Sequence, residues 1–156
     1  MMHPAEFSYY ASRHQKQINA VPVWEGDVLD LGTYQFEVVL LSGHTPGSIG
    51  LLEREKRFLI GGDTVQSGPV YMFGNGRNLP AYLAAIRKLQ AMGADFDKIY
   101  SSHGEMVLDK DILVDIEILA DEICQGEWPE PQEAPAHMPE TVKTYAKGRA
   151  AFYLEK

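Results

Sequence analysis

This chain of 156 residues has only one cysteine, no long apolar run and no excess of positive charge. The single cysteine, Cys124, excludes an intrachain disulfide and favours a reducing, cytoplasmic location. No apolar run approaches the roughly 20 residues of a membrane span, and the N-terminus has no basic region followed by an apolar one, so we expect neither a membrane anchor nor a signal peptide. The formal net charge of −8 disfavours a nucleic-acid partner, because phosphate binding needs clustered lysine and arginine.

The length and composition favour one globular domain. A chain of this size can bury a real core, and 45% hydrophobic with 23% charged residues is ordinary for a globular protein. We therefore expect residues 1–156 to form a single domain. Residues 127–140 contain four prolines and four glutamates, which predicts an extended connector. A terminal hairpin around Lys147-Gly148 is expected to follow it.

Apolar periodicity predicts alternating strands and helices. Helices are expected over residues 4–18, from an N-cap at Asn78 to Gly93, and from an N-cap at Asp109 to Gly126. Strands are expected at 35–42, 49–53, 57–61 and 98–102, with residues 19–34 and 63–78 as loops.

The strand at 36–41 is apolar on both faces, which is typical of a strand buried on both sides. Its side chains alternate, with Phe36, Val38 and Leu40 on one face and Val39 and Leu41 on the other. Two amphipathic helices can cover one face of the sheet. No other segment offers an obvious cover for the second face.

Three apolar runs each end at a residue that can bind a metal. The sequence V-V-L-L-S-G leads into His44, F-L-I-G-G leads into Asp63, and I-Y-S-S leads into His103. Small residues at the end of a strand allow a sharp turn, so three such strands in one sheet would gather two imidazoles and a carboxylate at one edge. Histidine and carboxylate ligands suit zinc, iron or manganese. The pattern therefore predicts part of a metal site.

The local sequences around these residues resemble those of a known family. The segment S-G-H-T-P-G-S at 42–48 resembles the G-H-T-P-G-S segment of the metallo-β-lactamase superfamily. Asp63 lies in L-I-G-G-D-T, which resembles that family's G-D-T motif, and His103 lies in S-H-G, which resembles its last histidine motif. The intervals of 19 and 40 residues are also similar. The resemblance covers roughly residues 25–125.

The resemblance implies a four-layer αββα sandwich of two similar halves, with a site that commonly holds two metals, often zinc. By resemblance, His44 would bind one metal, His103 the other, and Asp63 would bridge them. A water molecule between the metals would be ionised and act as the nucleophile.

The family's first motif, H-x-H-x-D-H, is absent from this chain. The remaining histidines, His3, His14 and His137, have no ligand-type residue at the required spacing. The chain therefore resembles only the C-terminal half of such a hydrolase, and four of the seven usual ligands are missing. A site that holds zinc has three or four protein ligands, so we expect zinc, or iron or manganese in its place, to be bound weakly or not at all.

We therefore expect an α/β fold, half of an αββα sandwich, with a mixed β-sheet and helices on one face. The expected function is metal-dependent hydrolysis of a small molecule, with the chain alone inactive. The alternative is a degenerate half-domain without catalysis that acts as an interaction or structural unit. A third interpretation is a mononuclear iron site built from the two histidines and one carboxylate. The sequence selects no substrate and identifies no catalytic residue beyond the ligands.

The uncovered sheet face predicts a partner. A bare apolar face larger than a few hundred Å² is unusual in monomers, so we expect either the missing N-terminal half or a homodimer packed sheet to sheet through strands 36–41 and 57–61. A second expectation concerns Tyr71, Met72, Phe73 and Arg77 in the loop after Asp63. They are candidates to line a substrate pocket, and the alternative is a loop that packs its own aromatic side chains.

Overall fold

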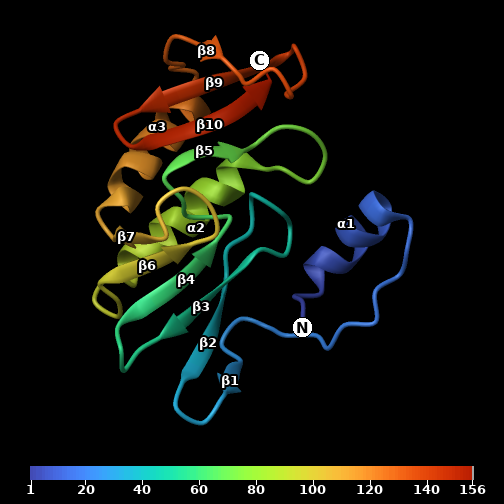
Figure 1. The fold of residues 1–156 in the computed structure, drawn as a ribbon, viewed down its shortest axis with the longest axis vertical. Helices are drawn as coiled ribbons and strands as arrows, with labels where there is room; N and C mark the ends of the chain where they lie inside the picture. Colours follow the sequence, from blue (N-terminus) through green and yellow to red (C-terminus); the bar gives the residue numbers. More distant parts are fainter. Residues whose placement is uncertain (156) are drawn as a thin grey trace.

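The computed structural model describes residues 1–155, which fold into two β-sheets and three helices (Figure 1). The elements are α1 (Ala5–His14), β1 (Val28–Asp30), β2 (Gln35–Leu40), β3 (Ile49–Glu53), β4 (Phe58–Gly62), β5 (Gly68–Tyr71), α2 (Leu79–Ala91), β6 (Lys98–Ser101), β7 (Val107–Asp109), α3 (Ile112–Gln125), β8 (Gln132–Glu133), β9 (Val142–Lys147) and β10 (Ala150–Glu155). Within these residues, no helix has the length and hydropathy needed to cross a bilayer.

The six-stranded sheet has the order β1-β2-β3-β4-β6-β7 and is mixed, because β4 and β6 run parallel while the other neighbours run antiparallel. A second sheet of four strands has the order β5-β10-β9-β8, with β5 and β10 parallel. The predicted α/β fold with a mixed sheet is confirmed. The second sheet was not predicted, since β5 follows the loop-like residues 63–67 and its partner strand lies far along the chain.

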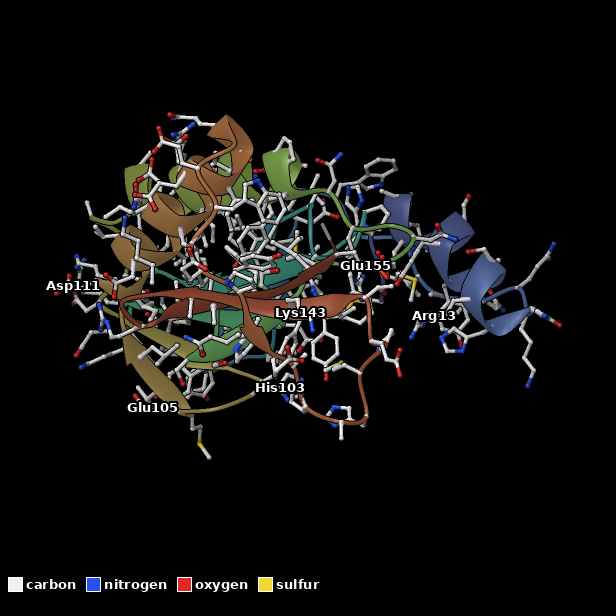
Figure 2. The ribbon with its side chains drawn as sticks, turned by 90° about the horizontal axis from the view of Figure 1, so that it is seen from above. Arg13, His103, Glu105, Asp111, Lys143 and Glu155 are labelled. Carbon is white, nitrogen blue, oxygen red and sulfur yellow. The ribbon has the colours of Figure 1, made fainter. Side chains whose placement is uncertain are left out.

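One face of the six-stranded sheet forms the core together with α2 and α3. Leu52, Leu59, Ile99 and Leu108 are directly paired across β3, β4, β6 and β7, and each is at most 4% exposed. They belong to one buried cluster with the apolar stripes of the two helices. Figure 2 shows both helices along the same side of the sheets. The prediction of helices on one face is therefore confirmed.

The opposite face of the six-stranded sheet is apolar but only partly buried. Directly paired residues again cross the strands, in the order Val38, Leu51, Ile60, Tyr100 and Val107. Val38 is fully buried, Leu51 and Ile60 are half-buried, and Tyr100 and Val107 are 39% and 43% exposed. Exposure therefore rises toward β7. We call this row, together with the rings of Tyr34, Phe36 and Phe58, the open face.

Local signals place the helices well, with one exception. The Asn78 side chain accepts a hydrogen bond from Ala81 N at 2.9 Å, as an N-cap should, and Gly126 ends α3 in the left-handed conformation with φ 89°. The predicted cap at Asp109 is wrong: Asp109 is the last residue of β7 and pairs with Lys98. A strand of three residues is too short to show a periodic pattern. The predicted closing hairpin is present as β9 and β10.

Candidate metal centre

His44 lies in a loop after β2 that packs directly on the start of α2. Gly43 has φ 134°, and a Cβ atom there would lie 2.4 Å from Tyr82 Cα, so only glycine fits. The backbone N–H of Asn78 donates to Gly43 O at 2.9 Å, which ties the loop to the helix cap. The residue before His44 thus fixes the loop against a buried helix.

Asp63 follows β4 at a tight turn that the same helix supports. Gly62 has φ 57°, and Thr64 N donates to Gly61 O at 3.2 Å. The hydroxyl of Tyr82, whose side chain is fully buried, donates to Thr64 O at 2.6 Å. Tyr82 therefore supports the His44 loop through its backbone and the Asp63 turn through its hydroxyl.

His103 follows β6, the parallel neighbour of β4. Ser101 Oγ donates to His103 O at 2.8 Å, and Gly104, with φ 74°, packs against Ser67 O. The His103 side chain is 67% exposed. Figure 2 shows it on the side of the sheets away from the helices. Because β4 and β6 are parallel, their ends bring Asp63 and His103 together.

The three residues predicted from the sequence meet at one edge of the sheet. Asp63 Oδ2 lies 3.9 Å from His44 Nε2, and Asp63 Oδ1 lies 3.4 Å from His103 Nε2. The carboxylate therefore lies between the two imidazoles and turns a different oxygen toward each. The His44 side chain is 11% exposed, whereas that of Asp63 is 50% exposed.

The environment of His44 favours its neutral, metal-binding form. Burial lowers the pKa of His44, the Arg77 guanidinium lowers it further, and Asp63 partly opposes both. Its Nδ1 lies 3.0 Å from Tyr71 O, and a neutral ring that donates from Nδ1 to this carbonyl keeps its Nε2 lone pair free toward Asp63. A carbonyl that fixes the tautomer in this way is typical of metal-binding histidines.

The N-terminal helix α1 contributes residues to this site that sequence reasoning missed. Glu6 Oε2 accepts a hydrogen bond from Gly47 N at 2.7 Å, and a Cβ atom on Gly47 would lie 2.6 Å from the Glu6 backbone N. Arg77 donates to His44 O and, at 3.1 Å, to the Tyr9 hydroxyl. These contacts join residues 41 and 68 positions apart, for which the sequence carries no local signal.

The four candidate residues at the end of β5 and in the loop after it do not line the depression beside Asp63. The Tyr71 and Phe73 rings lie 5.8 Å apart, and Met72 is buried in the core. Arg77 contacts the backbone of His44, not its ring. A shallow depression beside Asp63 is lined instead by Glu6, His44, Thr45, Ser48, Ile49, Gly62, Asp63, Thr64 and Ser102. Whether the four candidate residues contact a substrate stays a prediction.

The donors fit a divalent metal in kind but not in number. Imidazole nitrogen and carboxylate oxygen are zinc and iron ligands, and Asp63 contacts both histidines. Within residues 1–155, however, no three His, Cys, Asp or Glu side chains are arranged to hold a metal ion together. The chain presents two His–Asp pairs that share one carboxylate. Each pair has two ligands, fewer than the three or four of a stable site.

The chain matches known proteins over part of their length. The family model described as the metallo-beta-lactamase superfamily matches residues 1–103. Hydroxyacylglutathione hydrolase GloC of Haemophilus influenzae is 44% identical over 46 residues, covering 30% of this chain and 22% of that protein. Acyl-coenzyme A thioesterase MBLAC2 of Gallus gallus is 35% identical over 68 residues, covering 44% of this chain and 24% of that protein. The chain thus spans less than a quarter of each relative's length.

Solved structures share the fold. A metallo-beta-lactamase family protein, TTHA1429 from Thermus thermophilus, aligns with a TM-score of 0.63 at 16% identity, covering 84% of this chain and 56% of that chain. TTHA1623 in a di-iron-bound form aligns with a TM-score of 0.56 at 21% identity, covering 72% of this chain and 60% of that chain. This chain therefore corresponds to little more than half of each structure.

Proposed function

This chain belongs to the metallo-beta-lactamase superfamily, and on that premise we propose that it is the C-terminal half of a metal-dependent hydrolase whose centre is incomplete in this chain. Hydrolases occur among its relatives, and one structural neighbour holds two iron ions. The substrate is a small molecule, the metal is zinc, with iron or manganese as alternatives, and the location is cytoplasmic.

The observation that carries the proposal is the position of Asp63 between His44 and His103. Each histidine faces a different oxygen of the carboxylate, at 3.9 and 3.4 Å, so Asp63 can be shared by two metals that each take one histidine. A bound divalent metal would activate a water molecule as the nucleophile. This chain's own residues hold the ligands in place: the Tyr71 carbonyl orients His44, and Tyr82 supports the Asp63 turn.

The incompleteness follows from the ligand count. The sequence lacks H-x-H-x-D-H, and two ligands per metal leave the metal loosely held and the water poorly positioned. A second polypeptide sheet with its own ligands would complete the centre. An enzyme that is active as a single chain would not need this second set of ligands.

Zinc binding tests the ligand assignment. The purified chain should retain less than one zinc ion per chain after dialysis, and His103→Ala and Asp63→Ala should lower the zinc affinity measured by calorimetry by about tenfold or more, because ligand loss removes a direct metal bond. His137→Ala is the matched control, since His137 is also exposed and lies in the connector. Equal zinc affinity in the His103 and His137 variants would refute the assignment, and two tightly held ions per chain would refute incompleteness.

Hydrolysis tests whether the chain is catalytic alone. An acyl-coenzyme A thioester is the first substrate to try, because one relative is named for it, with a lactam and a phosphodiester beside it. The wild-type chain should hydrolyse each no faster than Asp63→Ala. Asp111→Ala is the matched control, since Asp111 is exposed and makes no capping hydrogen bond. A rate lost only on substitution of Asp63 would show that the chain is a complete enzyme.

The second candidate function is a non-catalytic interaction or structural unit. It is favoured by the absence, within the described residues, of any group of three metal-binding side chains. The zinc titration separates the two candidates, because a degenerate unit should bind zinc no better than its Asp63→Ala variant.

A further inference from the structure

The open face is a continuous apolar surface with aromatic rings at its centre. The rings of Tyr34, Phe36, Phe58 and Tyr100 form a chain in which neighbouring centroids are 6.0, 5.9 and 5.2 Å apart. With Ile60 they line a shallow depression on the sheet. On the helix-covered face of the same strands, Val39, Leu59 and Ile99 are at most 2% exposed. The apolar side chains on the two faces of the sheet are therefore very unequally buried.

The open face reaches the candidate metal centre. Ile49 pairs with Leu40, which places it on the same face as Leu51 and Ile60. Ile49 also lines the depression that holds His44 and Asp63. A layer packed on the open face would therefore border the metal centre.

We propose that a second copy of this chain occupies the open face, packed sheet to sheet about a twofold axis that runs along the strands. A twisted, apolar sheet face is best covered by another sheet face with the same twist. In such sandwiches the strand directions of the two sheets lie within about 30° of each other. A twofold interface uses the same patch on both partners. The dimer is inferred from the open face alone. Its consequence for the metal centre rests on the proposed function.

The exposed area is enough for a small interface. Tyr34 is 41% and Tyr100 is 39% exposed, so each leaves roughly 80 Å² of an aromatic side chain uncovered. With Val107 and the partly buried side chains of Leu51, Phe58 and Ile60, the open face exposes roughly 400 Å² per copy. Pairing two copies would remove roughly 800 Å² from water, which is the size of a small, weak interface. A patch of roughly 400 Å² is in the range of the largest patch on a monomer, and such patches are often functional.

Charge on the open face does not oppose self-association. Lys98 and Asp109 share the open side of β6 and β7, and they pair with each other. Lys56 lies 4.2 Å from the Tyr34 ring centroid at the rim. Lys56 also lies 3.5 Å from Glu53, whose side chain is 2% exposed and which pairs with Phe58 on the same side. Each of these two cations is therefore paired with a carboxylate of its own chain.

The direction of the axis decides where the two metal centres lie. Rotation by 180° about an axis parallel to the strands keeps strand direction, so both copies place His44, Asp63 and His103 at the same end of the sandwich. Packed sheets lie about 10 Å apart, which a metal and its ligands from both sides can span. The pair would supply four histidines and two aspartates, in place of two and one. The second copy would thus supply three donors, against the four that the chain lacks.

Analytical ultracentrifugation with a chelator present tests the dimer independently of metal. The wild-type chain should sediment as a dimer at micromolar concentration. Tyr100→Asp should weaken the dimer by more than about tenfold, because it places a charge in the apolar interface. Ile118→Asp is the matched control: Ile118 is 42% exposed on α3 and should leave the dimer intact. Circular dichroism verifies that both variants are folded. A folded wild-type monomer, or equal association of the two variants, overturns the proposal and leaves the face to a different polypeptide.

Sedimentation with added zinc tests the axis. If zinc binds across the interface, zinc at about ten times its dissociation constant should tighten the wild-type dimer by about tenfold. His103→Ala should abolish this response while leaving the metal-free dimer intact. If zinc binds without changing the dimer dissociation constant, the proposed axis parallel to the strands is wrong. A chain that dimerises but shows no zinc affinity overturns the proposed function and leaves the dimer standing.

Discussion

Removal of one hydroxyl group should weaken both the fold and the candidate metal centre. The Tyr82 side chain is fully buried, and its hydroxyl donates to Thr64 O at 2.6 Å, next to Asp63. Burial also raises the pKa of Tyr82, so the hydroxyl remains a donor at neutral pH. The substitution Tyr82→Phe keeps the ring that packs edge-on against Phe152 at 5.5 Å and deletes only the donor.

The loss of unfolding free energy in Tyr82→Phe depends on the Thr64 carbonyl, which is left without its hydrogen-bond donor. Thr64 is 1% exposed, so water does not replace the lost donor, and a buried carbonyl without its partner costs about 1–3 kcal/mol of unfolding free energy. A chain of this size should lose about 3 °C of Tm per kcal/mol, a fall of roughly 3–9 °C. Because Thr64 follows Asp63, zinc affinity should fall with stability.

Urea denaturation followed by circular dichroism measures the loss, and Tyr34→Phe is the matched control. Tyr34 is 41% exposed on the open face, and its phenylalanine variant retains the ring beneath Lys56. The control should stay within about 0.5 kcal/mol of wild type. If Tyr82→Phe is no less stable than the control, the hydroxyl does not support the Asp63 turn and the reasoning is wrong.

Three further predictions concern local geometry. Gly43→Ala should lower the unfolding free energy by about 3 kcal/mol or more in urea titrations, since φ is 134° and a Cβ atom would overlap the α2 backbone. Asn78→Ala should cost about 1 kcal/mol in the same assay, through loss of the bond from Ala81 N. The Arg57 guanidinium lowers the pKa of Asp97, so its stabilisation is present at neutral pH and is lost as pH falls below about 4. Carboxyl NMR titration should show the pKa of Asp97 rise in Arg57→Gln, and an unchanged pKa would contradict the pairing.

Elements whose signals are local could be predicted from the sequence. The helix α2 begins where Asn78 and Pro80 predict, because a cap acts through hydrogen bonds within one turn. The hairpin of β3 and β4 forms at the predicted place, because its strands are neighbours along the chain. The edge strands β1 and β7 have three residues each. Strands so short gain their pairing from the sheet beside them, which no local pattern describes.

Some residues of the candidate site could also be predicted from local sequence, and others could not. His44, Asp63 and His103 could be predicted because each stands at the end of an apolar run within a short motif. Glu6 and Tyr9 could not, because they reach the site only through the docking of α1 on residues far along the chain. Sequence therefore identified the side chains with metal chemistry but not those that hold the His44 loop.

The parallel pairing of β5 with β10 gives the candidate centre a late step in its folding. Gly68 pairs with Ala150, and Tyr71, at the end of β5, carries the carbonyl that His44 contacts. Such distant pairing has a high contact order and forms slowly. On a ribosome adding about 5–20 residues per second, β5 would wait roughly 4–16 s for its neighbour to be synthesised. Throughout that interval His44 would lack its orienting carbonyl, and β5 would expose an unpaired edge open to aggregation.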